Sequence, residues 1–154
     1  MTTAISDIHD ELHTIVATAL TGKGYSIIPN AYIAPDNAGL LLKKGYGIAV
    51  GPGTNTQRTL AGKLSFQRDF QVFLTALIPA TSNNYDARFT AEKTILEDFA
   101  LVLLAIEQAP SLNENSATSV LLNDGGLEYL EGDRDKYYLI ESTVTVEYVE
   151  NVNC

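Results

Sequence analysis

Apolar residues recur at helical spacing near the start of the chain. The stripe follows Ser6, a good N-cap residue, and Gly22 and Gly24 close the run. Acidic residues fill the first turn, where the helix dipole favours negative charge. The pattern predicts a helix over residues 7–21. The apolar stripe consists of Ile5, Ile8, Leu12, Ile15, Val16 and Ala19.

A second helical pattern covers residues 86–108 and ends before Pro110. Its expected core stripe consists of Ile95, Leu96, Phe99, Val102, Leu103 and Ile106. At about 100° per residue, Leu101 and Leu104 point nearly the opposite way. A helix that is apolar on two sides has two partners. The sheet is one, and the other is either the first helix or a neighbouring subunit.

Two long stretches alternate between apolar and polar residues, as antiparallel strands with one wet face do. One is residues 64–78, stopped by Pro79, and the other is residues 138–148. The apolar face of the first comprises Leu64, Phe66, Phe70, Val72, Leu74, Ala76 and Ile78. Arg68 is the one exception on that face. It is interpreted either as an edge residue with a packed stem and a solvated guanidinium, or as half of an ion pair across a subunit boundary.

Shorter strands are predicted at residues 25–28 and 46–50. Before the final strand, apolar runs at 120–122 and 127–130 flank an Asn-Asp-Gly-Gly sequence and are taken together as one further strand region. The expected order is therefore helix, three strands, helix, two strands. This predicts an α/β (α+β) fold with a mixed or mainly antiparallel sheet covered by two helices. No repeat or linker divides the chain, so residues 1–154 are expected to form one domain.

Polar loops are expected at residues 30–44 and 51–63. Both are long for a compact domain, which often signals a working surface. The predicted contact residues in these loops are Asp36, Asn37, Asn55, Gln57 and Arg58.

Composition narrows the class of protein. The chain has 154 residues, 45% of them apolar and 19% charged, which is enough for a core of its own. A net charge of −9 argues against binding nucleic acid by phosphate neutralisation. The single cysteine, Cys154, allows no internal disulfide, so a cytosolic assembly site fits. The longest apolar run, residues 99–106, is too short to span a bilayer, and no signal peptide is apparent.

His9 and His13 are the strongest candidates for chemistry. Two histidines four apart on a helix can share a metal ion, and the adjacent acid resembles a zinc-protease motif. However, Asp10 replaces the glutamate of that motif, and the sequence holds no third histidine. A partly solvated helix flank is the favoured interpretation, and a small metal-dependent hydrolase is the less favoured alternative.

Other catalytic motifs fit poorly. The glycines between residues 45 and 53 precede a polar stretch rather than a helix, unlike those of a dinucleotide-binding loop. There is no nucleophile elbow, and Cys154 lies far along the chain from either histidine. We therefore expect a protein without enzymatic activity, cofactor or metal.

The element order, in about 150 residues, resembles that of the tail terminator proteins of long-tailed bacteriophages. Three local features carry the resemblance: the short strand Tyr46–Gly51 before a polar loop, the strand containing residues 68–74 leading into the second helix, and the closing β-run 138–148.

The resemblance implies a structural virion protein that forms a ring, a hexamer in that family, at the head-proximal end of the tail. Such a ring stops polymerisation of the tail tube and provides the surface for head docking. Its implied partners are copies of itself, the major tail tube protein and a head-side connector or head-completion protein. DNA would pass through the bore without specific binding. The nearest alternative is another neck component, such as a head-completion or adaptor subunit.

A ring requires a head-to-tail interface that closes on itself. The predicted interface residues are Leu101, Leu104 and Arg68. No membrane contact is expected, and the implied location is the virion neck, after assembly in the host cytoplasm.

Overall fold

The computed structural model describes residues 3–28, 44–58, 63–79, 85–109, 119–131 and 136–151. Its elements are α1 (Ala4–Ala19), β1 (Ser26–Ile27), β2 (Lys44–Arg58), β3 (Lys63–Leu77), α2 (Tyr85–Gln108), β4 (Ser119–Glu131) and β5 (Lys136–Asn151). This order confirms the predicted succession of helix, three strands, helix and two strands.

The strands form one mixed sheet in the order β1-β2-β3-β5-β4. β1 is parallel to β2, and the other neighbours are antiparallel. The two long alternating stretches of the sequence, β3 and β5, pair along their whole length at the centre, so that Phe70 lies opposite Val144. The mainly antiparallel sheet expected from the sequence is therefore confirmed.

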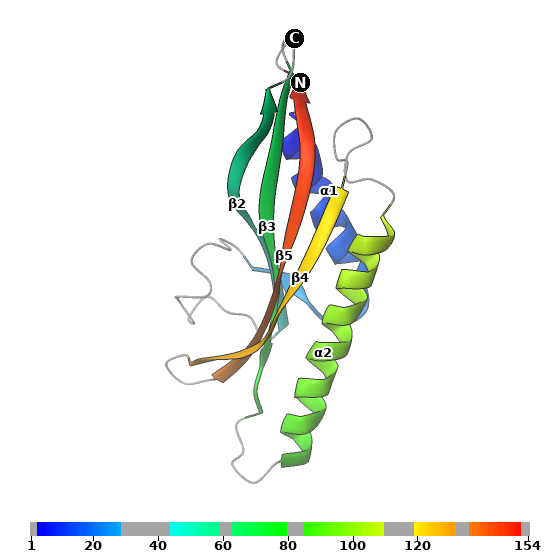
Figure 1. Ribbon diagram of the computed structural model, residues 1–154. Helices are drawn as coiled ribbons and strands as arrows, with labels where there is room; N and C mark the ends of the chain where they lie inside the picture. The colour runs from blue at the N-terminus through cyan, green and yellow to red at the C-terminus, as the bar shows by residue number, and fades with distance from the viewer. Residues whose placement is uncertain are drawn as a thin grey trace.

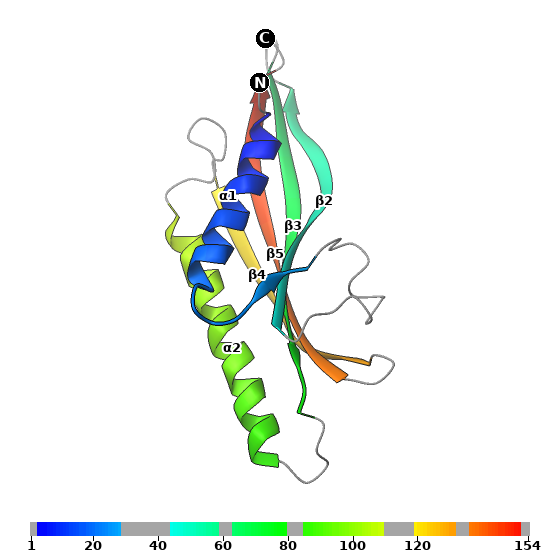
Figure 2. The same cartoon turned by 180° about the vertical axis from the view of Figure 1, so that it is seen from behind.

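Both helices lie on the same face of the sheet (Figures 1 and 2). Figure 2 shows α1 lying across the upper part of the sheet, with α2 beside it and extending further down. The core is formed where the apolar stripes of both helices meet the apolar face of the strands. Fully buried members of this core include Ile8, Leu12, Val16, Phe70, Val72, Leu74, Ile95, Phe99, Val102, Ile106 and Val144.

The opposite face of the sheet is only partly wet. Asp69 and Gln71 accept hydrogen bonds from the hydroxyls of Thr145 and Thr143, at 2.8 and 3.0 Å, on a polar stretch. Further along β3, however, Phe73 is 2% exposed. The expectation of one polar face thus holds for only half of the sheet.

Part of the buried region on that face lies near β1, the strand at the edge of the sheet beside β2. The side chain of Ile28 lies 2.7 Å from the position that a Cβ of Gly45 would take, so only glycine lets Ile28 approach this closely. Leu139, from β5, is also buried here, at 3% exposed. Ile28, Phe73 and Leu139 are thus buried apolar residues outside the main core.

The prediction of a long loop at residues 51–63 is wrong. β2 continues to Arg58 and pairs with β3 through irregularities between Val50 and Gly53 and between Asn55 and Gln57. Gly, Pro and Asn residues punctuate this segment and made it look like a loop, but here they form bulges inside a strand.

β4 contains both apolar runs that flank the Asn-Asp-Gly-Gly sequence. That sequence forms a bulge within the strand, with a register shift between Asp124 and Leu127. Gly126 has φ +82°, which supplies the left-handed conformation that the irregularity needs.

α1 begins earlier than predicted. Thr3, rather than Ser6, is the N-cap, and its hydroxyl accepts a hydrogen bond from the Ser6 N–H at 3.2 Å. The carboxylate of Glu150, on β5, accepts hydrogen bonds from the N–H groups of Ala4 (2.6 Å) and Ile5 (3.3 Å). An acidic side chain 145 residues away thus satisfies donors at the helix start, where the helix dipole also favours negative charge.

A buried carboxylate anchors the segment between α1 and β1 to α2. Asp98, 5% exposed, accepts a hydrogen bond from the Tyr25 hydroxyl at 2.8 Å and lies 3.6 Å from the Lys23 ammonium. The Lys44 ammonium donates to the Lys23 carbonyl oxygen and lies 5.0 Å from the centre of the Tyr25 ring. A charge buried at this depth needs such partners.

This arrangement predicts a loss of stability at alkaline pH. Burial, followed by the hydrogen bond and the negative charge of Asp98, raises the pKa of Tyr25 far above its ordinary value of 10.0. Because the folded state holds the proton more tightly than the unfolded state, this contribution is complete below about pH 10 and declines above it. Each pH unit above that point should lower the free energy of unfolding by about 1.4 kcal/mol. Chemical denaturation between pH 9 and 11 should show this decline in the free energy of unfolding. Tyr25→Phe should remove the part of the slope that one titrating proton contributes. A slope that is the same in Tyr25→Phe would contradict the prediction.

Candidate functional site

α2 carries exposed apolar side chains on the side away from the core. Leu101 is 43% exposed and Leu104 is 48% exposed, as their helical spacing predicts. Two further large side chains of α2 are exposed, Leu96 at 43% and Phe89 at 58%, and they lie further around the helix, more than about 100° from Leu101. We call these four residues together the outer face of α2. Their role in subunit contact remains a prediction.

Leu96 corrects the predicted core stripe. It lies about 100° around the helix from Ile95, which is fully buried. The sheet and α1 meet α2 over a narrower arc than the sequence suggested, centred on Phe99 and Val102. Leu96 therefore falls outside the contact, while Leu103 lies at its margin.

Arg68 is not at an edge, so that interpretation is wrong. It lies on β3, with β2 on one side and β5 on the other. Its Nε donates to the Tyr148 hydroxyl at 3.1 Å, and its Nη1 donates to the carbonyl oxygen of Gly51 at 2.9 Å. Its Nη2 lies only 2.5 Å from where a Cβ of Gly53 would be. The guanidinium therefore fastens the bulge of β2 within the subunit, and a role of Arg68 in subunit contact stays a prediction.

The predicted contact loops divide between described and undescribed residues. Asp36 and Asn37 lie outside the described residues. Asn55, Gln57 and Arg58 belong to β2, opposite Phe66, Ser65 and Leu64 of β3. The side chain of Asn55 is exposed. These three residues are thus presented from the far end of a long strand rather than from a loop.

His9 and His13 do lie side by side on α1, with ring centroids 4.6 Å apart in an edge-to-face arrangement. Burial, followed by the charge of His9, lowers the pKa of His13, and the charge of Asp10 opposes this shift. Within the described ranges, no three His, Cys, Asp or Glu side chains gather closely enough to hold a metal ion. The pair therefore has no third ligand among the described residues.

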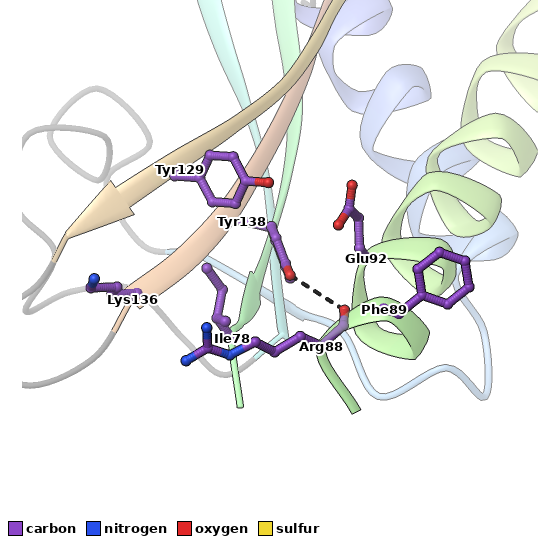
Figure 3. Close-up of a pocket in the computed structure, with 7 residues that line it drawn as sticks. All are labelled: Ile78, Arg88, Phe89, Glu92, Tyr129, Lys136 and Tyr138. Carbon is purple, nitrogen blue, oxygen red and sulfur yellow. Dashed lines mark hydrogen bonds between the residues drawn. The ribbon is translucent and has the colours of Figure 1, made fainter. Parts of the chain in front are cut away.

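A cleft of about 400 Å³ opens between the start of α2 and the lower end of the sheet (Figure 3). Residues from β4, β5, α2 and the end of β3 line it. They are Ile78, Arg88, Phe89, Glu92, Tyr129, Lys136 and Tyr138. The Tyr138 hydroxyl donates to the carbonyl oxygen of Arg88 at 3.3 Å and so joins β5 to the first turns of α2. The cleft thus has a fixed aromatic wall.

The walls of the cleft combine aromatic surface with charge. The rings of Tyr129 and Tyr138 lie 5.4 Å apart at a tilt of 54°, and Tyr129 is 64% exposed. Burial, followed by the negative charge of Glu92, raises the pKa of Tyr138, whereas the charge of Arg88 lowers it. The Nε of Arg88 donates to the carbonyl oxygen of Pro79 at 3.2 Å, which uses one of its five N–H donors.

Sequence reasoning missed this cleft. Its lining residues come from four elements and form no motif, and only the packing of α2 against the ends of β4 and β5 brings them together. The exposure of Leu101 and Leu104, in contrast, was visible as helical spacing, whereas that of Leu96 and Phe89 was missed. Neither helix in the described part of the chain is both long and apolar enough to cross a bilayer.

Comparison with models of known protein families and with curated proteins found no match for this chain.

Proposed function

We propose that this chain is a structural virion protein that forms a ring, a hexamer, at the head-proximal end of a bacteriophage tail. The ring caps polymerisation of the tail tube and offers the head its docking surface. The proposal rests on the resemblance in element order, and the mixed sheet with two helices on one face is compatible with it.

The outer face of α2 is the observation that carries self-association. Leu96, Leu101 and Leu104 are each more than two-fifths exposed along one helix. Large apolar side chains left this exposed on one helix are candidates for contact with a partner. Because a closed ring needs a heterologous contact, α2 of one copy is expected to meet a different surface of the next.

The mechanism is steric. The ring occupies the growing end of the tube and replaces the self-complementary face of the tube subunit with a surface that fits the neck. The exposed end of β2 around Asn55 is the proposed contact with the tube or the head-side connector. A chain with a net charge of −9 repels phosphates, which suits a bore through which DNA slides without specific binding.

Charged substitutions on the outer face of α2 test this proposal. Leu104→Asp and Leu101→Asp should abolish ring closure and leave folding intact, because an ionised carboxylate buried in an apolar contact is costly whereas the same group in water is not. Electron microscopy of infected cells should then show overlong tubes without heads. Thr14→Asp, which adds the same charge at an exposed position of α1, is the matched control and should leave assembly normal.

Three outcomes would contradict the proposal. Particles lacking the chain that show tails of normal length but no heads would indicate another neck component instead. Normal tails joined to heads would exclude both roles. Unfolding of Leu104→Asp in a thermal denaturation assay would show that this face belongs to the subunit's own core.

A further inference from the structure

The two histidines of α1 form a pair that the proposed function leaves unused. His9 and His13 are four residues apart, about one helical turn, so both side chains leave the same side of α1. They lie beside the buried stripe that contains Ile8 and Leu12 rather than within it. The side chain of His9 is 35% exposed, and His13 is half-buried. Both imidazoles are therefore partly open to water.

We propose that His9 and His13 together bind one divalent transition-metal ion of the kind that prefers imidazole, Ni²⁺ or Cu²⁺, with water at the remaining coordination positions. The protein supplies two ligands, so the bound ion exchanges with solvent, unlike the ion of a structural zinc site with four protein ligands. Such a site departs from the metal-free chain expected from the sequence, and it is independent of the ring proposed above.

The distance between the two rings fits a chelate with a right angle at the metal. A metal–nitrogen bond of about 2.1 Å plus a ring radius of about 1.1 Å places the ion about 3.2 Å from each ring centre. Two rings at a right angle then have centres about 4.5 Å apart, whereas a tetrahedral angle requires about 5.2 Å. The observed separation of the ring centroids is 4.6 Å. This value matches two neighbouring positions of the tetragonal geometry that Ni²⁺ and Cu²⁺ adopt.

Binding requires one nitrogen of each ring to face the same point, and the rings can reach this arrangement by turning in place. They meet edge to face, with an interplanar angle of 70°. The last side-chain torsion of histidine is broad, and its axis runs through the ring. Turning a ring about this axis reorients its nitrogens and leaves its centre nearly where it is. The chelate therefore needs no change in the backbone of α1.

The charge around the pair favours a dication. α1 contains three acidic residues, Asp7, Asp10 and Glu11, and neither Lys nor Arg. The Asp10 carboxylate lies 3.9 Å from Nδ1 of His9. Burial, followed by the charge of His9, lowers the pKa of His13, which favours the neutral imidazole that ligates metals. Acidic residues on the same helix thus raise the local concentration of a cation beside two uncharged ligands.

Calorimetric titration with NiCl₂ at about pH 7.5, on protein without a purification tag, tests the site. One ion should bind per chain, with a Kd below about 0.1 mM. His13→Ala and His9→Ala should each weaken binding at least about tenfold, because the second imidazole no longer acts at high effective concentration. Saturating Ni²⁺ should raise the melting temperature of the unmodified protein, since an ion that binds the folded state stabilises it. The single variants should lose this rise.

A relocated histidine provides the matched control. His13→Ala combined with Thr14→His keeps two histidines on α1 but moves the second by about 100° around the helix, to an exposed position. This double variant should bind Ni²⁺ as weakly as His13→Ala, and without metal it should melt at the same temperature as the unmodified protein. No saturable binding up to about 1 mM in the unmodified protein, an affinity unchanged by His13→Ala, or full affinity in the double variant would overturn the proposal.

Discussion

Phe99→Ala is expected to lower the free energy of unfolding by about 3–5 kcal/mol. Phe99 is 1% exposed at the centre of the contact between α2, α1 and the sheet. Removing its ring loses apolar burial and leaves a cavity that the close-packed neighbours fill only in part. Urea denaturation monitored by circular dichroism measures this loss.

Leu104→Ala provides the matched comparison on the same helix. Its side chain is 48% exposed, so truncation should change the free energy of unfolding by less than about 0.5 kcal/mol in the isolated subunit. The contrast between the two variants tests which side of α2 belongs to the core. Similar losses for both would contradict the assignment of an outer face.

Asp98→Ala should destabilise the fold by about 2–3 kcal/mol, since it removes one member of a buried polar cluster. The substitution leaves the Tyr25 hydroxyl and the Lys23 ammonium without the carboxylate that they share. The expected loss of stability is smaller than for breaking a fully buried ion pair, because the side chain of Lys23 is 35% exposed. Thermal and urea denaturation at pH 7 measure the effect.

Two variants separate charge from shape in this cluster. Asp98→Asn keeps an oxygen that accepts from Tyr25 and should cost about 1 kcal/mol. Glu97→Ala removes the neighbouring carboxylate, which is 66% exposed and 3.9 Å from Lys93, and should cost less than about 0.5 kcal/mol. A larger loss for Glu97→Ala than for Asp98→Ala would show that the buried cluster contributes little.

Periodicity was reliable wherever one side of an element faces water and the other faces the core. It located α2 within one residue of its start, and it identified β3 and β5 as the long strands. It failed at residues 51–58, where glycine, proline and asparagine indicated a loop. The turn preference of a few residues is a weaker influence than strand pairing. When most of a long strand is already hydrogen-bonded to its neighbour, the remaining residues continue the strand with bulges.

The predicted site residues show the same contrast between positions set within one element and positions set by contacts between elements. Leu101 and Leu104 were placed correctly on the outer side of α2, because their orientation depends only on helix geometry. Arg68 was misplaced at an edge, because its position in the sheet depends on strand order, which alternation does not encode. The order β3-β5-β4 places the last strand of the chain between two earlier ones.

By itself, the sequence determined the class of fold, the two helices, the central strands and the exposure of Leu101 and Leu104 on α2, since each follows from the spacing of apolar residues within one element. Only the tertiary structure decided the use of Glu150 at the start of α1, the burial of Asp98 with Tyr25, the attachment of Arg68 to the bulge of β2 and the cleft around Tyr138. The first three each join residues that are at least 17 positions apart. Such contacts depend on how whole elements pack, and a pattern read along one chain carries no information about the distance between two elements.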